Sequence, residues 1–334
     1  MIKKVLVTGG AGYVGNVLVP RLLAEGYEVT VYDILYFGSA TLPVSDPRLT
    51  VVKGDIRDIA TFKRAVAGQD AVLHLACISN DASFVLDEKL STSTNLDAFE
   101  PLVVAAKDAG VQRFVYCSTS SVYGVSDAPQ VTEDHPLVPL TLYNKYKGMC
   151  EPLLWKHMAD EFTCVTIRPA TVCGYSPRTR LDLSVNILTN HALTDNVIKV
   201  FGGSQKRPNL HIKDMVEAYV LMLRADHATI HGETFNIGHQ NLSIMAIAEL
   251  VKSVVEREFP DRPPIAIKIV PTDDNRSYHV NSDKIRRVLN FVPRLSVEDA
   301  IRDLCAAFRA GKLPDSMSND WYYNVRTMKA LQAA

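Results

Sequence analysis

The sequence predicts an α/β fold in which a doubly wound parallel sheet, with helices on both faces, is followed by a smaller C-terminal lobe. Through the first half of the 334 residues, apolar β-branched runs alternate with segments of helical periodicity. This alternation is typical of βαβ units. The segments between the runs are long enough for the crossovers that join parallel strands. After Arg168 the alternation becomes irregular, which predicts the second lobe.

The elements follow from these periodicities in order. Strands are expected at Lys4 to Val7, Glu28 to Tyr32, Thr50 to Lys53, Ala71 to Leu75, Arg113 to Cys117 and Thr163 to Ile167. Helices are expected at Val14 to Glu25, Ile59 to Ala67, Ser93 to Ala109 and Tyr143 to Asp160, and in the second lobe at Lys213 to Arg224 and Ile244 to Glu258. Because no linker or repeat stands out, we expect two lobes, residues 1–167 and 168–334, that share one core. A crossing of the chain back to the first lobe is possible.

Composition narrows the partners. Lys and Arg total 36 and Asp and Glu total 37, so the net charge gives no support for nucleic acid or an anionic membrane. No apolar run approaches the ~18 residues of a membrane span, and the N-terminal run breaks at glycine too early for a signal peptide. We therefore expect a cytoplasmic protein with small-molecule partners. The six cysteines are scattered without metal-ligand spacing, which favours free thiols and no metal.

A glycine-rich stretch, V-T-G-G-A-G-Y-V-G, joins the first expected strand to the first expected helix. Gly9 suits a tight turn, Gly12 lets the backbone approach a pyrophosphate, and Gly15 lets the helix pack close to the sheet. Tyr13 and Val14 complete the loop. This context predicts a Rossmann-type dinucleotide site and makes residues 1–167 the nucleotide-binding domain.

Asp33 ends the second expected strand, 18 residues after Gly15, where a carboxylate can accept hydrogen bonds from the adenosine ribose. It would repel a 2′-phosphate, and no Arg or Lys lies between Asp33 and Arg48 to offset that charge, so NAD is predicted over NADP. Two further strand ends belong to the same site. Asp55 and Ile56 can flank the adenine, while Leu75 and Ala76 lie beside the pyrophosphate; His74 is expected to be a satisfied strand-end residue rather than a catalyst.

The segment L-Y-N-K-Y-K places Tyr143 and Lys147 four residues apart, one turn apart on the same face of a helix. A tyrosine titrates near pH ~10, but a positive charge beside it favours the phenolate. Such a pair can accept a proton near neutral pH. The same spacing also occurs on merely solvated helix faces, so the pair alone leaves both interpretations open.

With these residues in place, residues 3 to 310 resemble the extended short-chain dehydrogenase/reductase family, in its nucleotide-sugar epimerase/dehydratase branch. The resemblance rests on T-G-G-A-G-Y-V-G, Asp33, G-D-I, H-L-A, F-V-Y-C-S-T-S-S-V-Y-G, Tyr143 with Lys147, and R-P-N-L-H-I-K-D. It implies a tightly held NAD on the first lobe and a nucleotide diphosphate sugar in the cleft beneath the second. Tyr143 would then be the acid/base, Lys147 would bind the nicotinamide ribose, and Thr119 would hydrogen-bond the sugar oxygen. Ser118, Ser120 and Ser121 are alternatives to Thr119.

Departures from the family pattern narrow the reaction. Similar dehydratases carry Thr-Asp-Glu where this chain has Thr119, Ser120 and Ser121, and similar decarboxylases carry Glu at the position of Ser121. Simple 4-ketosugar reductases often use NADPH, against which Asp33 argues. By elimination, the expected activity is epimerisation at C4 through a 4-keto intermediate. The alternatives are an NAD(H)-dependent 4-ketosugar reductase or related oxidoreductase, and a non-catalytic NAD-sensing regulator, which commonly lacks the Tyr/Lys pair.

The resemblance also implies substrate contacts and an oligomer. Arg207 and Arg276 match family arginines that bind the diphosphate, and Ser79 and Asn80 are expected to face the sugar. Thr171 stands where similar enzymes carry a substrate-binding asparagine, a role that Asn186 could partly take. A homodimer is expected through the helices at 93–109 and 143–160. The tail from Leu313 to Ala334 has no assigned role.

Overall fold

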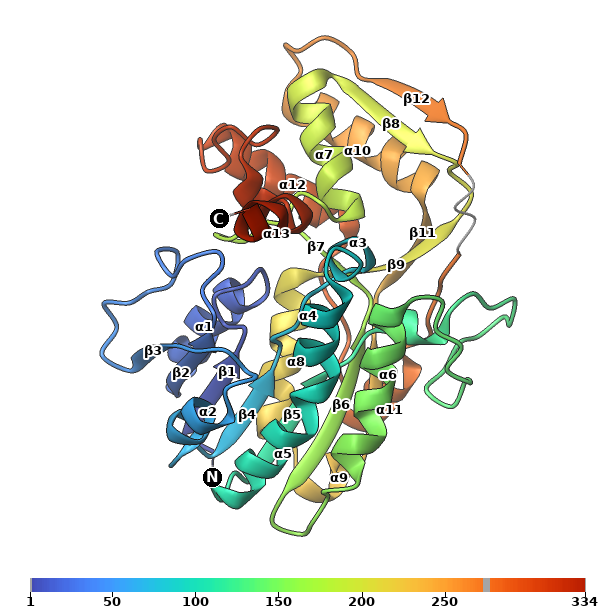
Figure 1. Cartoon of the computed structure of the whole chain (residues 1–334). Coiled ribbons are helices and arrows are strands. Elements are labelled where there is room, and N and C mark those ends of the chain that lie inside the picture. The colour runs from blue at the N-terminus through green and yellow to red at the C-terminus, as the bar shows by residue number, and fades with distance from the viewer. Residues whose placement is uncertain (1, 273–276, 334) are drawn as a thin grey trace.

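A seven-stranded parallel sheet forms the centre of the computed structural model, which describes residues 2–272 and 277–333 (Figure 1). The strand order is β10-β6-β5-β4-β1-β2-β3. Their bounds are β1 Lys4–Thr8, β2 Glu28–Asp33, β3 Leu49–Lys53, β4 Ala71–His74, β5 Arg113–Cys117, β6 Thr163–Pro169 and β10 Thr234–Ile237. Strands are added toward one edge of the sheet from β1 to β3 and toward the other edge from β4 onward. The order therefore switches between β1 and β4, which is where ligands bind in doubly wound folds. The predicted fold class is confirmed.

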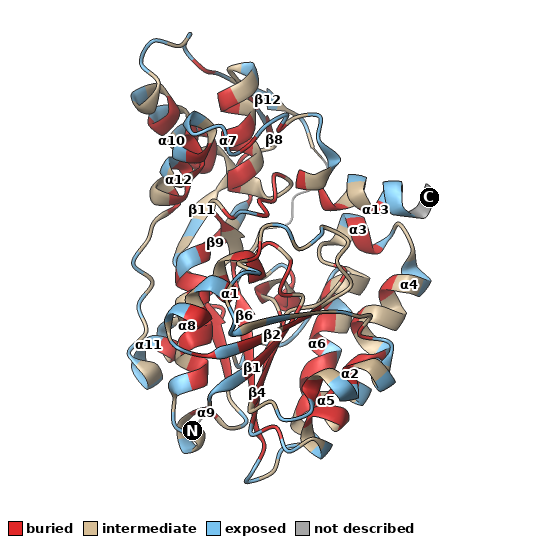
Figure 2. Cartoon of the chain, turned by 90° about the vertical axis from the view of Figure 1, so that its left-hand side faces the viewer, coloured by how far each residue is buried: buried red, intermediate tan, exposed pale blue. Residues whose placement is uncertain are grey.

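Helices cover both faces of this sheet and bury its apolar side chains (Figure 2). One face is covered by α1 Gly15–Ala24, α8 Ile212–Arg224 and α11 Asp283–Leu289. The other is covered by α2 Ile59–Val66, the π-helix η1 Ser93–Asp97, α5 Phe99–Asp108 and α6 Leu142–Trp155. Strand residues such as Val5, Val7, Leu6 and Val72 are fully buried because helices lie over each side of the sheet.

Strand β10 and helix α8 lie after Arg168 in the sequence but join or pack against this first sheet. Strand β10 pairs in parallel with β6, placing Phe235 opposite Ile167, and α8 packs its buried face, including Met215 and Tyr219, against the sheet. The chain thus returns to the first lobe after entering the second. The boundary between the two domains at residues 167 and 168 remains a prediction.

The second lobe has a helical core and two small sheets. Its core contains α7 Ser184–Asp195, α10 Ile244–Glu258 and α12 Val297–Arg309, beside the paired strands β8 Val197–Phe201 and β12 Ala266–Val270. Strands β7 Thr171–Cys173, β9 Lys206–His211 and β11 Gln240–Ser243 form a separate three-stranded sheet. Short helical elements complete the chain: α3 Asp81–Phe84, α4 Glu88–Thr92, η2 Ser120–Tyr123, α9 His227–Ile230, η3 Asp320–Tyr322 and α13 Asn324–Ala333.

Two predicted helices differ from the structure. The helix expected over 93–109 is interrupted, because residues 93–97 are π-helical and α5 begins only at Phe99. Asn95, in the π-turn, donates to Ile78 O and accepts from Ile78 N, so its side chain ties the turn to the loop after β4. The helix expected to reach Asp160 ends at Trp155, and Ala159 instead forms a bridge with Phe162.

The C-terminal segment lies between the lobes. Tyr322 and Tyr323 are buried against Leu181, Leu304 and Leu313, and α13 lies beside α3 (Figure 1). Within the described part of the chain, no helix combines the length and apolarity needed to cross a lipid bilayer.

Candidate active site

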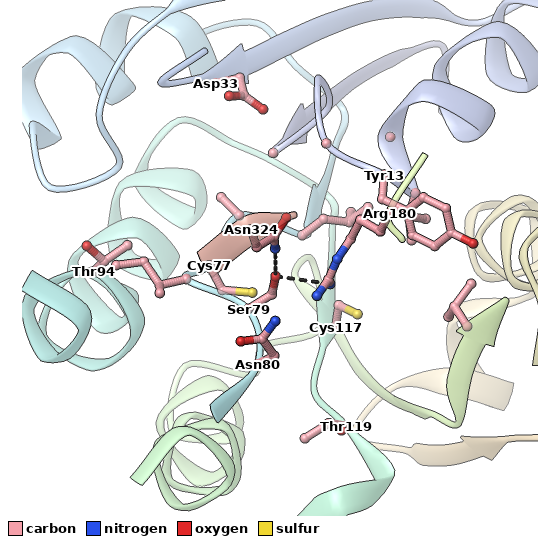
Figure 3. A pocket seen from close by; sticks show the side chains of 18 of the residues that line it. Tyr13, Asp33, Cys77, Ser79, Asn80, Thr94, Cys117, Thr119, Arg180 and Asn324 are labelled. Atoms are coloured by element: carbon pink, nitrogen blue, oxygen red, sulfur yellow. Dashed lines mark hydrogen bonds between the residues drawn. The ribbon is translucent and has the colours of Figure 1, made fainter. Parts of the chain in front are cut away.

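A cavity of about 390 Å³ lies at the carboxyl ends of the parallel strands, with walls from both lobes (Figure 3). It brings together most of the residues that the sequence singled out. The predicted residues in its walls are Gly9, Gly12, Tyr13, Val14, Gly15, Asp33, Asp55, Ile56, Leu75, Ala76, Ser79, Asn80, Thr119, Tyr143, Lys147 and Thr171. The role of each residue stays a prediction. Seven separate segments of the chain nevertheless bring these residues to one cavity.

The glycine loop has the shape of a phosphate cradle. Gly9 adopts φ +71°, and a Cβ there would lie 2.8 Å from the backbone of Ala76. A Cβ on Gly15 would overlap the Gly10 carbonyl, so both positions require glycine. Helix α1 begins at Gly15, which lines the cavity, so the positive end of the helix dipole lies at this wall. An anionic group therefore fits at this turn.

Asp33 lies at the cavity wall above the glycine loop (Figure 3). Its Oδ2 accepts from Ala11 N at 3.0 Å and its Oδ1 accepts from Leu35 N at 2.7 Å, so the carboxylate also fixes the loop. Burial raises the pKa of Asp33 above its usual value, while the two N–H donors and Arg178 lower it. The carboxylate keeps oxygen lone pairs with which it can accept from ribose hydroxyls.

Polar side chains at the ends of β4 and just after β3 already have partners within the chain. Thr8 Oγ1 and His74 Nδ1 are 2.9 Å apart, and burial lowers the pKa of His74 to about 3, so the ring is neutral. The predicted strand-end role of His74 is confirmed in its geometry. Asp55 pairs with Arg57, with 2.5 Å between Oδ2 and Nη2. The charge of Asp55 is therefore compensated by Arg57.

Tyr143 and Lys147 both face the cavity from α6. The helix begins where Thr141, in an extended conformation, accepts at its Oγ1 from Asn144 N, and this cap sets the register of the next turn. Lys147 Nζ donates to Cys117 O at 2.7 Å. Burial raises the pKa of Tyr143 above 10, and Lys147 opposes that rise. Burial lowers the pKa of Lys147, but the nearby Cys77 and Tyr143 outweigh it, so the lysine stays charged.

The hydroxyl run after β5 separates into different environments. Thr119 Oγ1 lies 2.7 Å from Ser121 Oγ and accepts from Ser121 N at 3.2 Å, so Thr119 both lines the cavity and caps η2. Ser118 also lines the cavity, but it donates to Glu151 Oε1 at 2.6 Å. Ser120 is buried outside the wall. Thr119 is therefore the hydroxyl best placed for a ligand.

A polar network crosses the cavity between the lobes. Ser79 Oγ accepts from Arg180 Nη1 at 3.2 Å and from Asn324 Nδ2 at 2.9 Å (Figure 3). Asp182 accepts from Arg180 Nε at 2.9 Å and from Asn324 N at 3.1 Å. Asn80 lies next to this network with φ +78° and ψ 155°, a backbone region that is costly for a residue with a side chain. Three segments distant in the sequence thus meet at Ser79.

Two predicted substrate residues, Asn186 and Arg207, are not brought to the cavity. Asn186 is fully buried behind it, where Nδ2 donates to Arg180 O at 2.8 Å and Oδ1 accepts from Gly174 N at 2.9 Å. Its amide therefore supports the loop rather than facing a ligand. Arg207, on β9, lies outside the cavity wall and places its guanidinium 5.1 Å from the Tyr278 ring centroid. Arg276 falls outside the described residues.

Several wall residues escaped the sequence analysis. They are Arg178 and Arg180 from the S-P-R-T-R loop, Asn324 and Met328 from α13, and the thiols of Cys77 and Cys117. Two arginines after an irregular P-A-T-V-C-G stretch were a detectable sign of an anion site. Nothing in the local pattern pointed to Asn324 or Met328. The structure supports free thiols at all six cysteines, of which Cys77 and Cys117 are half-buried.

This chain offers a fitting site for a dinucleotide. The glycine loop would hold a diphosphate, Asp33 a ribose, and Lys147 with Tyr143 the nicotinamide half of the molecule. When bound there, NAD supplies a hydride acceptor.

Comparison with known proteins agrees with this fit. The sequence profile of the NAD dependent epimerase/dehydratase family matches residues 5–238. A UDP-glucose 4-epimerase from Lactobacillus helveticus is 29% identical over 323 residues, covering 89% of this chain and 94% of that protein. A dTDP-glucose 4,6-dehydratase from Streptomyces venezuelae, solved with NAD bound, has a TM-score of 0.81 at 28% identity, covering 92% of this chain and 98% of that one. A UDP-glucose 4-epimerase from Thermotoga maritima, solved with UDP-glucose, has a TM-score of 0.81 at 25% identity, covering 92% and 99%.

The matched family is NAD-dependent and the Streptomyces structure holds NAD, so the predicted cofactor, NAD, is confirmed. The family profile spans most of the chain and includes the glycine loop, Asp33, Tyr143 and Lys147. The chain belongs to the NAD-dependent epimerase/dehydratase family, within the extended short-chain dehydrogenases/reductases.

Proposed function

We propose that this chain is an NAD-dependent nucleotide-sugar epimerase that inverts C4 through a 4-keto intermediate. The observation that carries the proposal is the composition of the cavity wall. Tyr143, Lys147 and Thr119 line the same cavity as the glycine loop and Asp33. This arrangement holds a proton acceptor and a nucleotide site within one enclosed volume.

The proposed mechanism assigns one task to each side chain. Thr119 hydrogen-bonds the C4 oxygen and orients the hydroxyl toward Tyr143. Tyr143 removes the hydroxyl proton as the C4 hydrogen leaves as hydride to the cofactor, and it returns the proton when the other face of the sugar is reduced. Lys147 stabilises the phenolate, because its positive charge lowers the pKa of Tyr143. The chain therefore moves one proton out and back.

The charge distribution of the wall argues against loss of water. Of the residues that the structure describes, the only carboxylates lining the cavity are Asp33 and Asp55, both in the nucleotide-binding half. Removing a hydroxyl as water requires an acid beside it and a base at the adjacent carbon. Ser120 and Ser121 occupy the positions where similar dehydratases carry an Asp-Glu pair, and Ser121 is hydrogen-bonded to Thr119. Epimerisation needs no such pair.

The polar network around Ser79 suits the sugar. Ser79, Asn80 and Asn324 provide donors and acceptors, while Arg180 adds a charge held by Asp182. Hydroxyl-rich ligands are recognised by mixed donors and acceptors of this kind. We propose that the sugar of a nucleotide diphosphate sugar lies here, next to Tyr143.

The test follows the fate of one hydrogen. Purified protein with its NAD is incubated with UDP-, GDP-, CDP- and dTDP-hexoses carrying deuterium at C4, and the products are analysed by NMR and mass spectrometry. We expect a C4 epimer of unchanged mass that retains the deuterium at C4, without accumulation of reduced cofactor. Loss of water would instead indicate a dehydratase. Stoichiometric consumption of NADH with a 4-keto sugar would indicate a reductase, and absence of turnover with all of these sugars would favour the non-catalytic alternative.

A further inference from the structure

Arg178 is a buried cation that the proposed reaction does not use. Its side chain is 1% exposed, and its guanidinium carbon lies 3.5 Å from the centroid of the Phe37 ring. Nη2 donates to Asn324 Oδ1 at 2.6 Å. Arg178 is thus clamped between the loop after β2 and the start of α13.

The charge of Arg178 is incompletely compensated. Among the described residues, its Nε has no hydrogen-bond partner and no carboxylate forms an ion pair with it. Arg180, two residues away, shows the contrast, because its Nε donates to Asp182 at 2.9 Å. Burial, followed by the charge of Arg180, lowers the pKa of Arg178 to about 9. A buried, unpaired guanidinium is costly in a folded protein, so a compensating anion is expected.

The position of Arg178 points to the identity of that anion. It lines the same cavity as Gly9, Gly12 and Tyr13, and it lowers the pKa of Asp33. Its effect on Asp33 places it near the nucleotide-binding part of the wall. A dinucleotide bound there presents two phosphates, and a guanidinium fork matches their oxygens.

We propose that Arg178 binds the diphosphate of NAD from the second lobe and that residues 320–328, here called the C-terminal strap, hold it in place. The glycine loop then contacts the diphosphate from one side and Arg178 from the other. This role concerns the cofactor alone, so it does not depend on which sugar reaction the chain catalyses.

The contacts of the C-terminal strap explain how it would hold the arginine. Trp321 Nε1 donates to Phe37 O at 2.9 Å, which fixes the loop whose ring stacks on Arg178. Tyr322 O accepts from Leu181 N at 2.9 Å, which fixes the S-P-R-T-R loop from its other end. Asn324 completes the clamp through Arg178 and Ser79. The strap therefore covers the nucleotide, and NAD leaves only when these contacts break.

The test measures cofactor affinity without any sugar. Arg178→Gln and Arg178→Met are stripped of NAD and titrated with NAD, ADP and adenosine by calorimetry, beside the unmodified protein. We expect NAD and ADP to bind about 10- to 100-fold more weakly to both variants, because a charge-assisted hydrogen bond to phosphate is lost. Adenosine, which lacks phosphate, should bind as before. Arg302→Gln, which removes an exposed arginine paired with Glu298, is the matched control and should leave all three affinities unchanged.

A second measurement separates binding from misfolding. Because the variants remove an unpaired buried charge, the thermal midpoint of the stripped Arg178→Met protein should equal or exceed that of the unmodified protein, while its rise on adding NAD should shrink. Unchanged NAD and ADP affinities in a folded variant would overturn the proposal. An equal loss for adenosine would also overturn it, since Arg178 would then act only by shaping the cavity.

Discussion

Asn324 Nδ2 donates a hydrogen bond of 2.9 Å to Ser79 Oγ, although the two residues lie 245 positions apart in the chain. The bond joins the start of the last helix to the loop after β4, across the cavity. The same asparagine accepts from Arg178 and, through its backbone N–H, donates to Asp182. One residue therefore links the C-terminal strap to both lobes.

We predict that Asn324→Ala releases the C-terminal strap. Its side-chain bonds to Ser79 and Arg178 are lost, so bound NAD should dissociate at least tenfold faster, which stopped-flow dilution into a cofactor scavenger measures. Lys329→Ala, at an exposed position on the same helix, is the control and should dissociate NAD at the normal rate. Equal rates in both variants would mean that the strap does not retain the cofactor.

We predict that Asp33 determines the preference for NAD over NADP. Asp33→Ala should reduce the ratio of NAD affinity to NADP affinity by about tenfold or more, because the carboxylate that repels a 2′-phosphate is removed. Asp33→Asn is the control for shape, since it removes the charge while its amide oxygen can still accept from one of the two loop N–H groups. Titration calorimetry on stripped protein measures both ratios. Equal NAD and NADP affinities in the unmodified protein would contradict the assignment.

We predict that Tyr143→Phe lowers kcat by about 10²- to 10⁴-fold with little change in NAD binding, because only the proton acceptor is lost. Tyr146→Phe is the internal control. Its ring packs against Phe84, with centroids 5.5 Å apart, outside the cavity wall, so this variant should stay active. Turnover of the identified nucleotide sugar is the measurement. The reverse pattern, an inactive Tyr146→Phe beside an active Tyr143→Phe, would move catalysis to the other face of α6.

We predict that the pH profile of kcat depends on the positive charge of Lys147. Because burial raises the pKa of Tyr143 and Lys147 opposes that rise, removing the lysine charge in Lys147→Met should raise the tyrosine pKa further. A higher pKa means that the phenolate forms only at higher pH, so the acidic limb of the kcat profile should shift to the alkaline side. Profiles across pH ~6 to 10 check this sign. An acidic shift would show that Lys147 does not act on Tyr143 through charge.

Removing one partner of the buried pair of Arg168 and Glu151 should cost more stability than removing one partner of an exposed ion pair. Arg168 Nη2 and Glu151 Oε2 are 2.5 Å apart, with side chains 4% and 0% exposed. Arg168→Met alone should lower the free energy of unfolding by about 3–5 kcal/mol, because it leaves a buried carboxylate unpaired. Arg302→Ala, which breaks an exposed pair, should cost about 1 kcal/mol or less. Urea denaturation compares the two.

The predicted homodimer would use α5 and α6, which pack side by side on one face of the first lobe (Figure 1). Met149, on α6, is 42% exposed, and a carboxylate there would be buried in such an interface. We expect light scattering to give a dimer mass for the unmodified protein and a monomer mass for Met149→Glu. Ile269→Glu, on β12 in the other lobe, should remain dimeric. A monomeric unmodified protein at micromolar concentration would rule the prediction out.

The sequence by itself determined the features that depend on local spacing. Apolar β-branched runs predicted the strands of the sheet and helical-period segments predicted its helices, because both patterns follow from local backbone geometry. The V-T-G-G-A-G-Y-V-G turn and the four-residue spacing of Tyr143 and Lys147 were readable for the same reason, since the nucleotide turn and one helical turn each lie within a few consecutive residues.

Only the tertiary structure decided the features that depend on packing between distant segments. Asn95 ties the π-turn at Ser93–Asp97 to the backbone of Ile78, and the amide of Asn186 lies behind the cavity, hydrogen-bonded to Gly174 and Arg180. Arg178 lines the cavity with its guanidinium held between the Phe37 ring and Asn324. No local pattern encodes such contacts, since each depends on the relative placement of elements that fold far apart in the sequence, and that placement is fixed by the shared core.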